Sequence, residues 1–149
     1  MERQYDLVII GAGPAGMSAA VYGSRAGLKT LILENSVPGV KLTKTHKISN
    51  YPGTGELAGA DLAAKMFEQA TMFGAEYGYG NVVKVNKDKT IECEDGTIIE
   101  AKAIIVATGT KERNLNIPGE AENIGKGVSF CAVCDGAFFR DKEVVVIGG

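Results

Sequence analysis

Short unbroken apolar runs alternate with glycine-rich turns along this chain, a pattern typical of strands buried on both faces of a parallel sheet. Residues 5–10 and 29–34 form the first two runs, and the segment between them opens with Pro14 and closes before Gly27. Proline is tolerated in the first turn of a helix and glycine is common just beyond the last, so a helix is predicted from about Pro14 to Ala26. Together these elements make a β-α-β unit of about 30 residues, the size of a mononucleotide-binding half-fold.

The middle of the chain changes character twice. Residues 35–58 contain prolines and glycines without any period, so we expect an irregular loop, and loops of this length are usually functional. Residues 59–74 are predicted to form an amphipathic helix packed on the core, because apolar side chains recur at helical spacing: Leu62, Met66, Ala70 and Phe73.

Shorter strands follow this helix. Residues 75–100 predict a small antiparallel meander beside the parallel sheet, and Asp95-Gly96 is a hairpin-turn signal within it. Cys93 shares a strand face with Ile91, which favours a buried, inert thiol.

Two further apolar runs, residues 103–107 and 143–149, predict buried strands. The second run needs a following helix to cover it, so we expect the chain to be a fragment of a longer protein. The polar connector from Lys111 to Lys126 has the composition of a domain hinge. We therefore expect an α/β fold in two parts, a Rossmann-like domain over residues 1–112 and the start of a second α/β domain over residues 113–149.

Composition narrows the function classes. The chain has 149 residues, 45% of them apolar, and a net charge of −2. Without clustered Lys and Arg, neither nucleic acid nor an anionic membrane surface is expected as a partner. No apolar run is long enough to cross a bilayer, and no signal peptide is recognised at the start, so a cytoplasmic protein is expected.

A glycine turn joins the first strand to the first helix, with the order Gly11, Ala12, Gly13, Pro14, Ala15 and Gly16. In a dinucleotide site the first glycine allows the tight turn, the second lets a pyrophosphate approach the backbone, and the third lets helix and strand pack closely. Glu34, at the end of the next strand, is placed to bind ribose hydroxyls of FAD or NAD. A glycine-rich packing turn is the alternative interpretation. Thr108 and Gly109 also end a strand and suit contact with the same ligand.

Two cysteines separated by two residues, Cys131 and Cys134, are followed directly by Asp135. A zinc site needs four ligands, and beyond this pair the chain offers only Cys93, His46 and carboxylates, so no metal site is assigned. A redox dithiol needs only the pair, and Cys131 at the start of a helical turn would be the better nucleophile. Asp135 is the candidate proton donor and acceptor for disulfide exchange.

Several motifs resemble, in order, those of low-molecular-weight thioredoxin reductases. They are the Gly11–Gly16 turn, Asn50-Tyr51-Pro52-Gly53, Ala107-Thr108-Gly109, Cys131-Ala132-Val133-Cys134-Asp135-Gly136 and the terminal Val146-Ile147-Gly148-Gly149. The dithiol motif is the specific part, because the glycine turn is shared with many flavoproteins. The resemblance covers essentially the whole chain.

The resemblance implies FAD in the first nucleotide site and an NADPH-binding second domain, only begun in this chain, that carries the dithiol. Electrons would pass from NADPH to flavin, then to the Cys131–Cys134 disulfide, and finally to thioredoxin. By analogy Cys134 faces the flavin, Cys131 attacks thioredoxin and Asp135 is the acid. Positions matching Lys41, Leu42 and Asn50 contact FAD, and family members are homodimers.

One departure concerns Val40, which stands where the family usually has a second glycine. Compared with glycine, valine at this position places a side chain next to the expected flavin. Other functions remain open: a related flavoprotein that serves a peroxiredoxin or takes electrons from ferredoxin, and a non-catalytic FAD- or zinc-binding module.

Overall fold

The computed structural model describes residues 4–148, which divide between Gly109 and Thr110 into two compact units. The first unit contains, in order, β1 (Gln4–Ile10), α1 (Pro14–Arg25), β2 (Thr30–Glu34), α2 (Val40–Thr43), α3 (Gly59–Met72), β3 (Glu76–Tyr79), β4 (Val82–Val85), β5 (Thr90–Cys93) and β6 (Ile98–Val106). The second contains α4 (Glu120–Asn123), α5 (Ala132–Asp135) and the 3-10 helix η1 (Gly136–Phe139).

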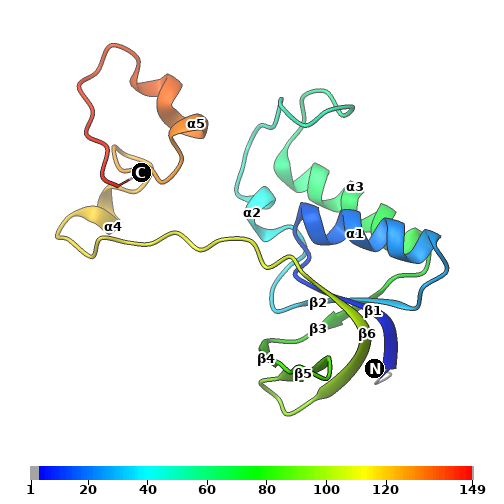
Figure 1. The fold of residues 1–149 in the computed structure, drawn as a ribbon. Helices are drawn as coiled ribbons and strands as arrows, with labels where there is room; N and C mark the ends of the chain where they lie inside the picture. Colours follow the sequence, from blue (N-terminus) through cyan, green and yellow to red (C-terminus); the bar gives the residue numbers. More distant parts are fainter. Residues whose placement is uncertain (1–3, 149) are drawn as a thin grey trace. The chain divides into compact units, whose positions relative to one another are not determined.

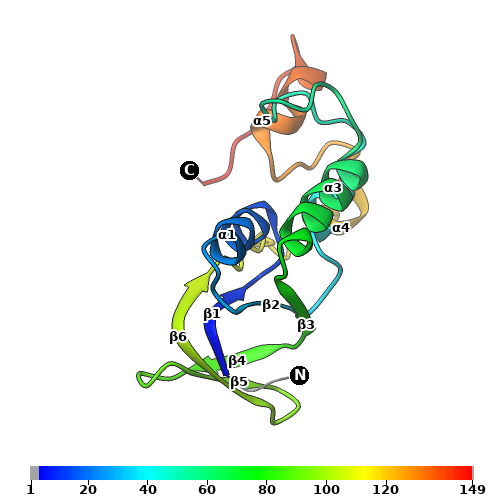
Figure 2. The same cartoon turned by 90° about the vertical axis from the view of Figure 1, so that its right-hand side faces the viewer.

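The first unit is built on one six-stranded mixed sheet with the order β3-β2-β1-β6-β5-β4. Strand β1 pairs in parallel with β2 on one side and with β6 on the other, while β4, β5 and β6 pair antiparallel. Helices α1 and α3 lie side by side on one face of the parallel strands, and β4 and β5 lie on the other side (Figure 1, Figure 2). The expected Rossmann-like α/β fold with an antiparallel meander is confirmed.

Each face of the parallel strands has its own core. On the helix side, Ile9 and Ile32 pack with Met17, Leu62 and Met66. On the face away from the helices, buried residues of β1 and β2 pack against β5 and β6. This second cluster is made of Tyr5, Val8, Ile10, Leu31, Leu33, Ile91, Cys93 and Ile99. The apolar runs of β1 and β2 are continuous rather than alternating because both faces are buried.

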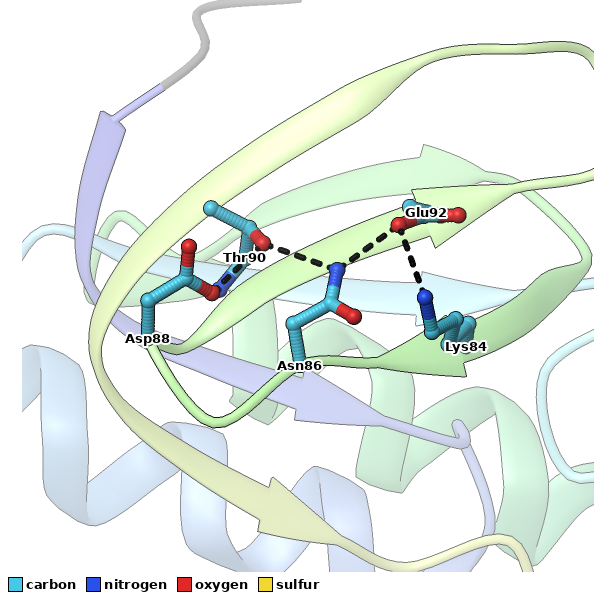
Figure 3. Close-up of polar contacts among 5 residues, drawn as sticks. All are labelled: Lys84, Asn86, Asp88, Thr90 and Glu92. Carbon is cyan, nitrogen blue, oxygen red and sulfur yellow. Dashed lines mark hydrogen bonds and ion pairs between the residues drawn. The ribbon is translucent and has the colours of Figure 1, made fainter.

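The outer face of the β4–β5 hairpin is polar (Figure 3). The Asn86 side-chain amide donates to Thr90 Oγ1 at 3.0 Å and to Glu92 Oε1 at 2.7 Å, and Lys84 Nζ lies 3.6 Å from the same Glu92 oxygen. Asp88 accepts hydrogen bonds from the backbone N–H and the hydroxyl of Thr90, and the hydroxyl bond is the main cause of its lowered pKa. These contacts fix the hairpin, and they involve no residue of the predicted sites.

Two expectations about the elements of the first unit need correction. Residues 35–58 are not wholly irregular, because α2 occupies Val40–Thr43 and Ile48 pairs with Leu57 through two backbone hydrogen bonds. The prediction of an all-antiparallel region after residue 75 is also wrong for β3, which pairs in parallel with β2 at the sheet edge. The chain reaches that edge through α3, a crossover that parallel pairing requires.

Several side chains that were predicted to be buried are exposed in the structure. Phe73 is 42% exposed, because α3 ends at Met72 and the Phe73 ring stacks instead under the Arg25 guanidinium, 5.5 Å away. The strand over 103–107 exists as the end of β6, but Val106 is 67% exposed. Residues 143–148 form no strand and Val145 is 86% exposed, because no neighbouring strand pairs with them among the described residues.

No helix within residues 4–148 is long and apolar enough to cross a membrane.

Candidate functional site

The Gly11–Gly16 turn lies where three strands end together. The Gly11 N–H donates to the Leu33 carbonyl at 2.8 Å, and the Ala107 N–H donates to the Ile10 carbonyl at 2.8 Å. The ends of β1, β2 and β6 are thereby held around the first turn of α1. Ligands of open α/β sheets bind at the carboxyl ends of the strands, so this is the expected position for a nucleotide site.

Each of the three glycines of the turn is explained by a different feature of the structure. Gly11 has φ of +109°, and a β-carbon on it would collide with the Ala107 carbonyl. A β-carbon on Gly16 would overlap the Gly11 carbonyl, which explains how α1 approaches β1 so closely. Gly13 has φ of −77°, and a β-carbon there would meet nothing within 4 Å. The first and third glycines are required by the protein itself, whereas the space over the second is open.

The first turn of α1 is suited to phosphate. The N–H groups of Ala15 and Gly16 donate to no acceptor among the described residues, and the turn carries no acidic side chain. Free N–H groups at the start of a 12-residue helix attract anions through direct hydrogen bonds and the helix dipole. Pro14 costs nothing here because its missing N–H needs no partner.

Glu34, predicted to hold a ribose, lies at the carboxyl end of β2 and faces the same turn. Its Oε2 accepts from the Ala12 N–H at 2.8 Å and its Oε1 from the Asn35 N–H at 2.9 Å. The carboxylate is half-buried and held in place by two backbone groups. Its negative charge also contributes, after burial of the ring, to the raised pKa of Tyr77.

The loop before α2 reaches the same place. The Gly39 N–H donates to the Ala12 carbonyl at 2.8 Å, and Gly39 has φ of +69° beside the Ala63 side chain. Sequence reasoning assigned no structural role to Gly39, although its position in a Pro-Gly pair signals a special turn. Val40 follows in an ordinary helical conformation, so the backbone does not require glycine at the position where this chain departs from the family.

The other residues predicted to contact the nucleotide differ in their burial and in their distance from the glycine turn. Lys41 is exposed on α2, and Leu42 packs on the helix-side core. The Thr108 Cα lies 3.1 Å from the point where a Gly11 β-carbon would be, so Thr108 flanks the glycine turn. Gly109 follows it with φ of +71°. Asn50 is exposed in the loop between α2 and α3.

The second unit contains the two thiols as a disulfide. Cys131 and Cys134 are bonded, with their Cα atoms 5.2 Å apart. Cys131 is the N-cap of α5, as expected, and its sulfur accepts from the Cys134 N–H at 3.1 Å. The Asp135 N–H donates to the Cys131 carbonyl at 3.0 Å, which closes the turn. A short disulfide ring and an acidic side chain therefore share one helical turn.

Sequence reasoning missed Ser129, whose hydroxyl contacts the turn from outside. Its Oγ lies 2.6 Å from Asp135 Oδ2 and 3.1 Å from the Cys131 backbone nitrogen. The signal available in the sequence was a serine two residues before the first thiol, a spacing at which hydroxyls accept backbone N–H bonds.

Cys93 is remote from this chemistry in the sequence and has a different environment. It is free and buried in the core between the parallel strands and the meander. Burial, assisted by the charge of Asp95, raises the pKa of its thiol. The prediction of a buried thiol is confirmed. Across residues 4–148, no three His, Cys, Asp or Glu side chains gather so that they could hold a metal ion.

A family model described as "Pyridine nucleotide-disulphide oxidoreductase" matches residues 5–149. The chain belongs to this family. It is 49% identical over 150 residues to thioredoxin reductase of Bacillus subtilis, covering 99% of this chain and 48% of that protein. With thioredoxin reductase of Listeria innocua it shares 51% identity over 151 residues, covering 99% of this chain and 47% of that protein.

Among solved structures, thioredoxin reductase of Streptococcus pyogenes superposes with a TM-score of 0.82 at 47% identity, covering 95% of this chain and 47% of that one. The chain thus spans about half the length of the relatives that it matches. These three relatives are all thioredoxin reductases, the group whose dithiol motif this chain resembles.

Proposed function

We propose that the complete protein is a flavoprotein disulfide oxidoreductase that uses NADPH to reduce oxidised thioredoxin. The observation that carries the proposal is the Cys131–Cys134 disulfide on a helical turn directly before Asp135, in a chain of the pyridine nucleotide-disulphide oxidoreductase family. A protein of this kind works in a reducing compartment such as the cytoplasm, where paired thiols are usually catalytic. We also propose that it forms a homodimer.

FAD fits the first unit on local grounds. The open space over Gly13 and the free N–H groups of Ala15 and Gly16 suit a pyrophosphate, and the carboxylate of Glu34 suits ribose hydroxyls. We assign further contacts with the cofactor to Lys41, Leu42, Asn50, Thr108 and Gly109. When bound, FAD supplies a two-electron relay between a nicotinamide and a disulfide.

The second unit supplies the disulfide chemistry. We propose that residues 113–149 begin the NADPH-binding domain, that Cys131 attacks the thioredoxin disulfide and that Cys134 resolves the mixed disulfide. The N-cap position of Cys131 supports this order, because the start of a helical turn stabilises a thiolate. Asp135 is then the group that exchanges protons with the sulfurs.

A trapping experiment on the complete protein tests this assignment. Cys134→Ser leaves Cys131 able to attack thioredoxin but removes the resolving thiol, so a stable mixed disulfide should accumulate on a non-reducing gel and turnover should stop. Cys131→Ser should give no such adduct. Cys93→Ala is the matched control, because it removes a thiol that lies in a core, and it should turn over normally.

Three results would contradict the proposal. Normal thioredoxin reduction by Cys134→Ser would remove the dithiol from the pathway. Reduction supported by ferredoxin but not by NADPH would change the donor. A purified protein without flavin absorption would favour a non-catalytic binding module.

A further inference from the structure

The dithiol turn is held from outside by one hydroxyl group, that of Ser129. The Cys131 N–H donates to Ser129 Oγ at 3.1 Å, and Ser129 Oγ lies 2.6 Å from Asp135 Oδ2. A third contact, to the Cys131 carbonyl, is longer at 3.4 Å. A serine hydroxyl has one hydrogen to donate, and the much shorter distance assigns that hydrogen to the carboxylate.

Ser129 therefore joins the two ends of the turn. Its oxygen accepts from the N–H of Cys131, the N-cap of α5, and its hydroxyl donates to Asp135, the last residue of α5. Hydrogen bonds to an ionised carboxylate are short and about twice as strong as neutral ones, and 2.6 Å falls in their range. The orientation of the Asp135 carboxyl group is thus set by Ser129.

The surroundings of Asp135 offer no competing charge within the hollow that it lines. This hollow, of about 450 Å³, is otherwise formed by glycines, apolar residues and Ser129, including Phe130, Phe139 and the run Val144–Ile147. Asp135 is the only titratable side chain among its described lining residues. On its own turn, Cys131 and Cys134 become titratable only when their disulfide is reduced.

We propose that Ser129 is a positioning residue that holds Asp135 through Oδ2, so that the proton for disulfide exchange is carried on Oδ1. The hydroxyl can donate to Oδ2 whether the carboxyl group is ionised or protonated on its other oxygen. The same hydrogen bond then persists through the proton transfer. This inference rests on the proposed function for the direction of the exchange, but the contact itself does not.

The exchange balances with this assignment. The Cys131 thiolate attacks one sulfur of the partner disulfide, an S–S bond forms as the partner's S–S bond breaks, and the leaving thiolate takes the proton from Asp135 Oδ1. The Cys134 thiol gives its proton back to Asp135, and its thiolate then attacks the Cys131 sulfur. This closes the Cys131–Cys134 disulfide and releases the second partner thiolate, which is protonated from water. Overall the partner gains two electrons and two protons. The dithiol, which starts as the Cys131 thiolate and the Cys134 thiol, loses the two electrons and one proton, and water supplies the other proton.

The experiment uses the complete protein with Ser129→Ala, Ser129→Thr, Asp135→Asn and the double substitution Ser129→Ala/Asp135→Asn. General acid–base catalysis contributes about 10²–10⁴-fold, and losing only the orientation of the acid should cost a part of this, about tenfold in thioredoxin reduction. Ser129→Thr keeps a hydroxyl and should restore the rate to within about threefold. The double variant should be no slower than Asp135→Asn alone, because the serine acts only through the acid.

The pH profile separates positioning from a merely structural role. A positioning serine acts on the proton transfer itself, so Ser129→Ala should change the dependence of the rate on pH, whereas a merely structural serine would change only the size of the rate. An unchanged profile would overturn the proposal, and so would losses that multiply in the double variant.

A second measurement does not depend on turnover. The rate at which iodoacetamide alkylates the reduced dithiol is followed against pH in each variant by mass spectrometry. Ser129→Ala should shift this profile, and it should not shift it further in the Asp135→Asn background. If the wild-type protein did not reduce thioredoxin, the proposed function would fail while this profile still decided the role of Ser129.

Discussion

At the scale of single residues, the three glycines of the Gly11–Gly16 turn show that the same residue type can serve different purposes. Gly11 and Gly16 sit against backbone carbonyls, so a β-carbon at either position would collide with the protein itself. Gly13 adopts a conformation open to any residue and has empty space over it. The spacing of the motif is visible in the sequence, but only the structure separates the glycines needed for folding from the one available to a ligand.

Gly13→Ala should therefore leave folding intact and weaken FAD binding. Its added methyl group meets no protein atom within 4 Å, but it would occupy the space through which a pyrophosphate approaches the backbone. We expect an unchanged unfolding temperature and an affinity for FAD lower by about tenfold or more, near 1.4 kcal/mol. Fluorescence titration of the apoprotein with FAD measures this.

The matched variant Gly16→Ala should instead lower the unfolding temperature, because its methyl group overlaps the Gly11 carbonyl. Equal FAD affinity in Gly13→Ala and wild type would show that no phosphate lies over this residue.

At the scale of elements, local patterns predicted what local interactions determine. The β1-α1-β2 unit was predictable because Pro14 and Gly27 mark the helix ends and both strands are continuous apolar runs. Helix α2 was missed, since four residues between Gly39 and Lys44 carry no period. The direction of β3 depends on pairing with β2 about 45 residues earlier, which short-range turn signals cannot report. At the candidate site, the glycine turn, Glu34 and the dithiol could be recognised from the sequence. The contacts of Gly39 and Ser129 could not, because they join residues through backbone geometry that no sequence pattern reports.

The junction of α2 and α3 depends on Gly59. Its N–H donates to the Thr45 carbonyl at 2.9 Å, and a β-carbon there would lie 2.8 Å from the same oxygen and closer still to the Leu42 carbonyl. Gly59→Ala should lower the free energy of unfolding by about 2–3 kcal/mol, since both obstacles are backbone atoms. Urea unfolding followed by circular dichroism measures the change.

Ala60→Ser is the matched control, one residue along on the exposed side of α3, and should stay within about 0.5 kcal/mol of wild type. If the two variants were equally stable, the junction would be able to relax.

At the scale of the whole molecule, the Gly11–Gly16 turn and the dithiol lie in different units. We expect the stability of the first unit to depend on pH through its buried tyrosine and cysteine side chains. Burial is the main cause of the raised pKa of Tyr5, Tyr77 and Cys93. For Tyr5 the hydrogen bond to Glu76 at 2.7 Å adds to it. Each group binds its proton more tightly when folded, so the stability present at neutral pH is lost as the pH rises.

We expect the urea midpoint to fall progressively above about pH 8.5, where the unfolded thiol begins to ionise, and more steeply above about pH 10, where unfolded tyrosines follow. Tyr5→Phe removes one of the ionisable groups, so the urea midpoint should fall less steeply above about pH 10 in this variant. The same slope in Tyr5→Phe and wild type would exclude Tyr5 as a source of the alkaline loss.

The unpaired run Val144–Ile147 has a practical consequence for handling the chain. Four consecutive β-branched residues stand 60%, 86%, 82% and 65% exposed, without an intervening charge or proline. Such a segment is a template for intermolecular β-pairing, the first step of cross-β aggregation. In concentrated solution this chain should self-associate through that segment. Val145→Lys places a charge within the apolar run and should keep the chain monodisperse.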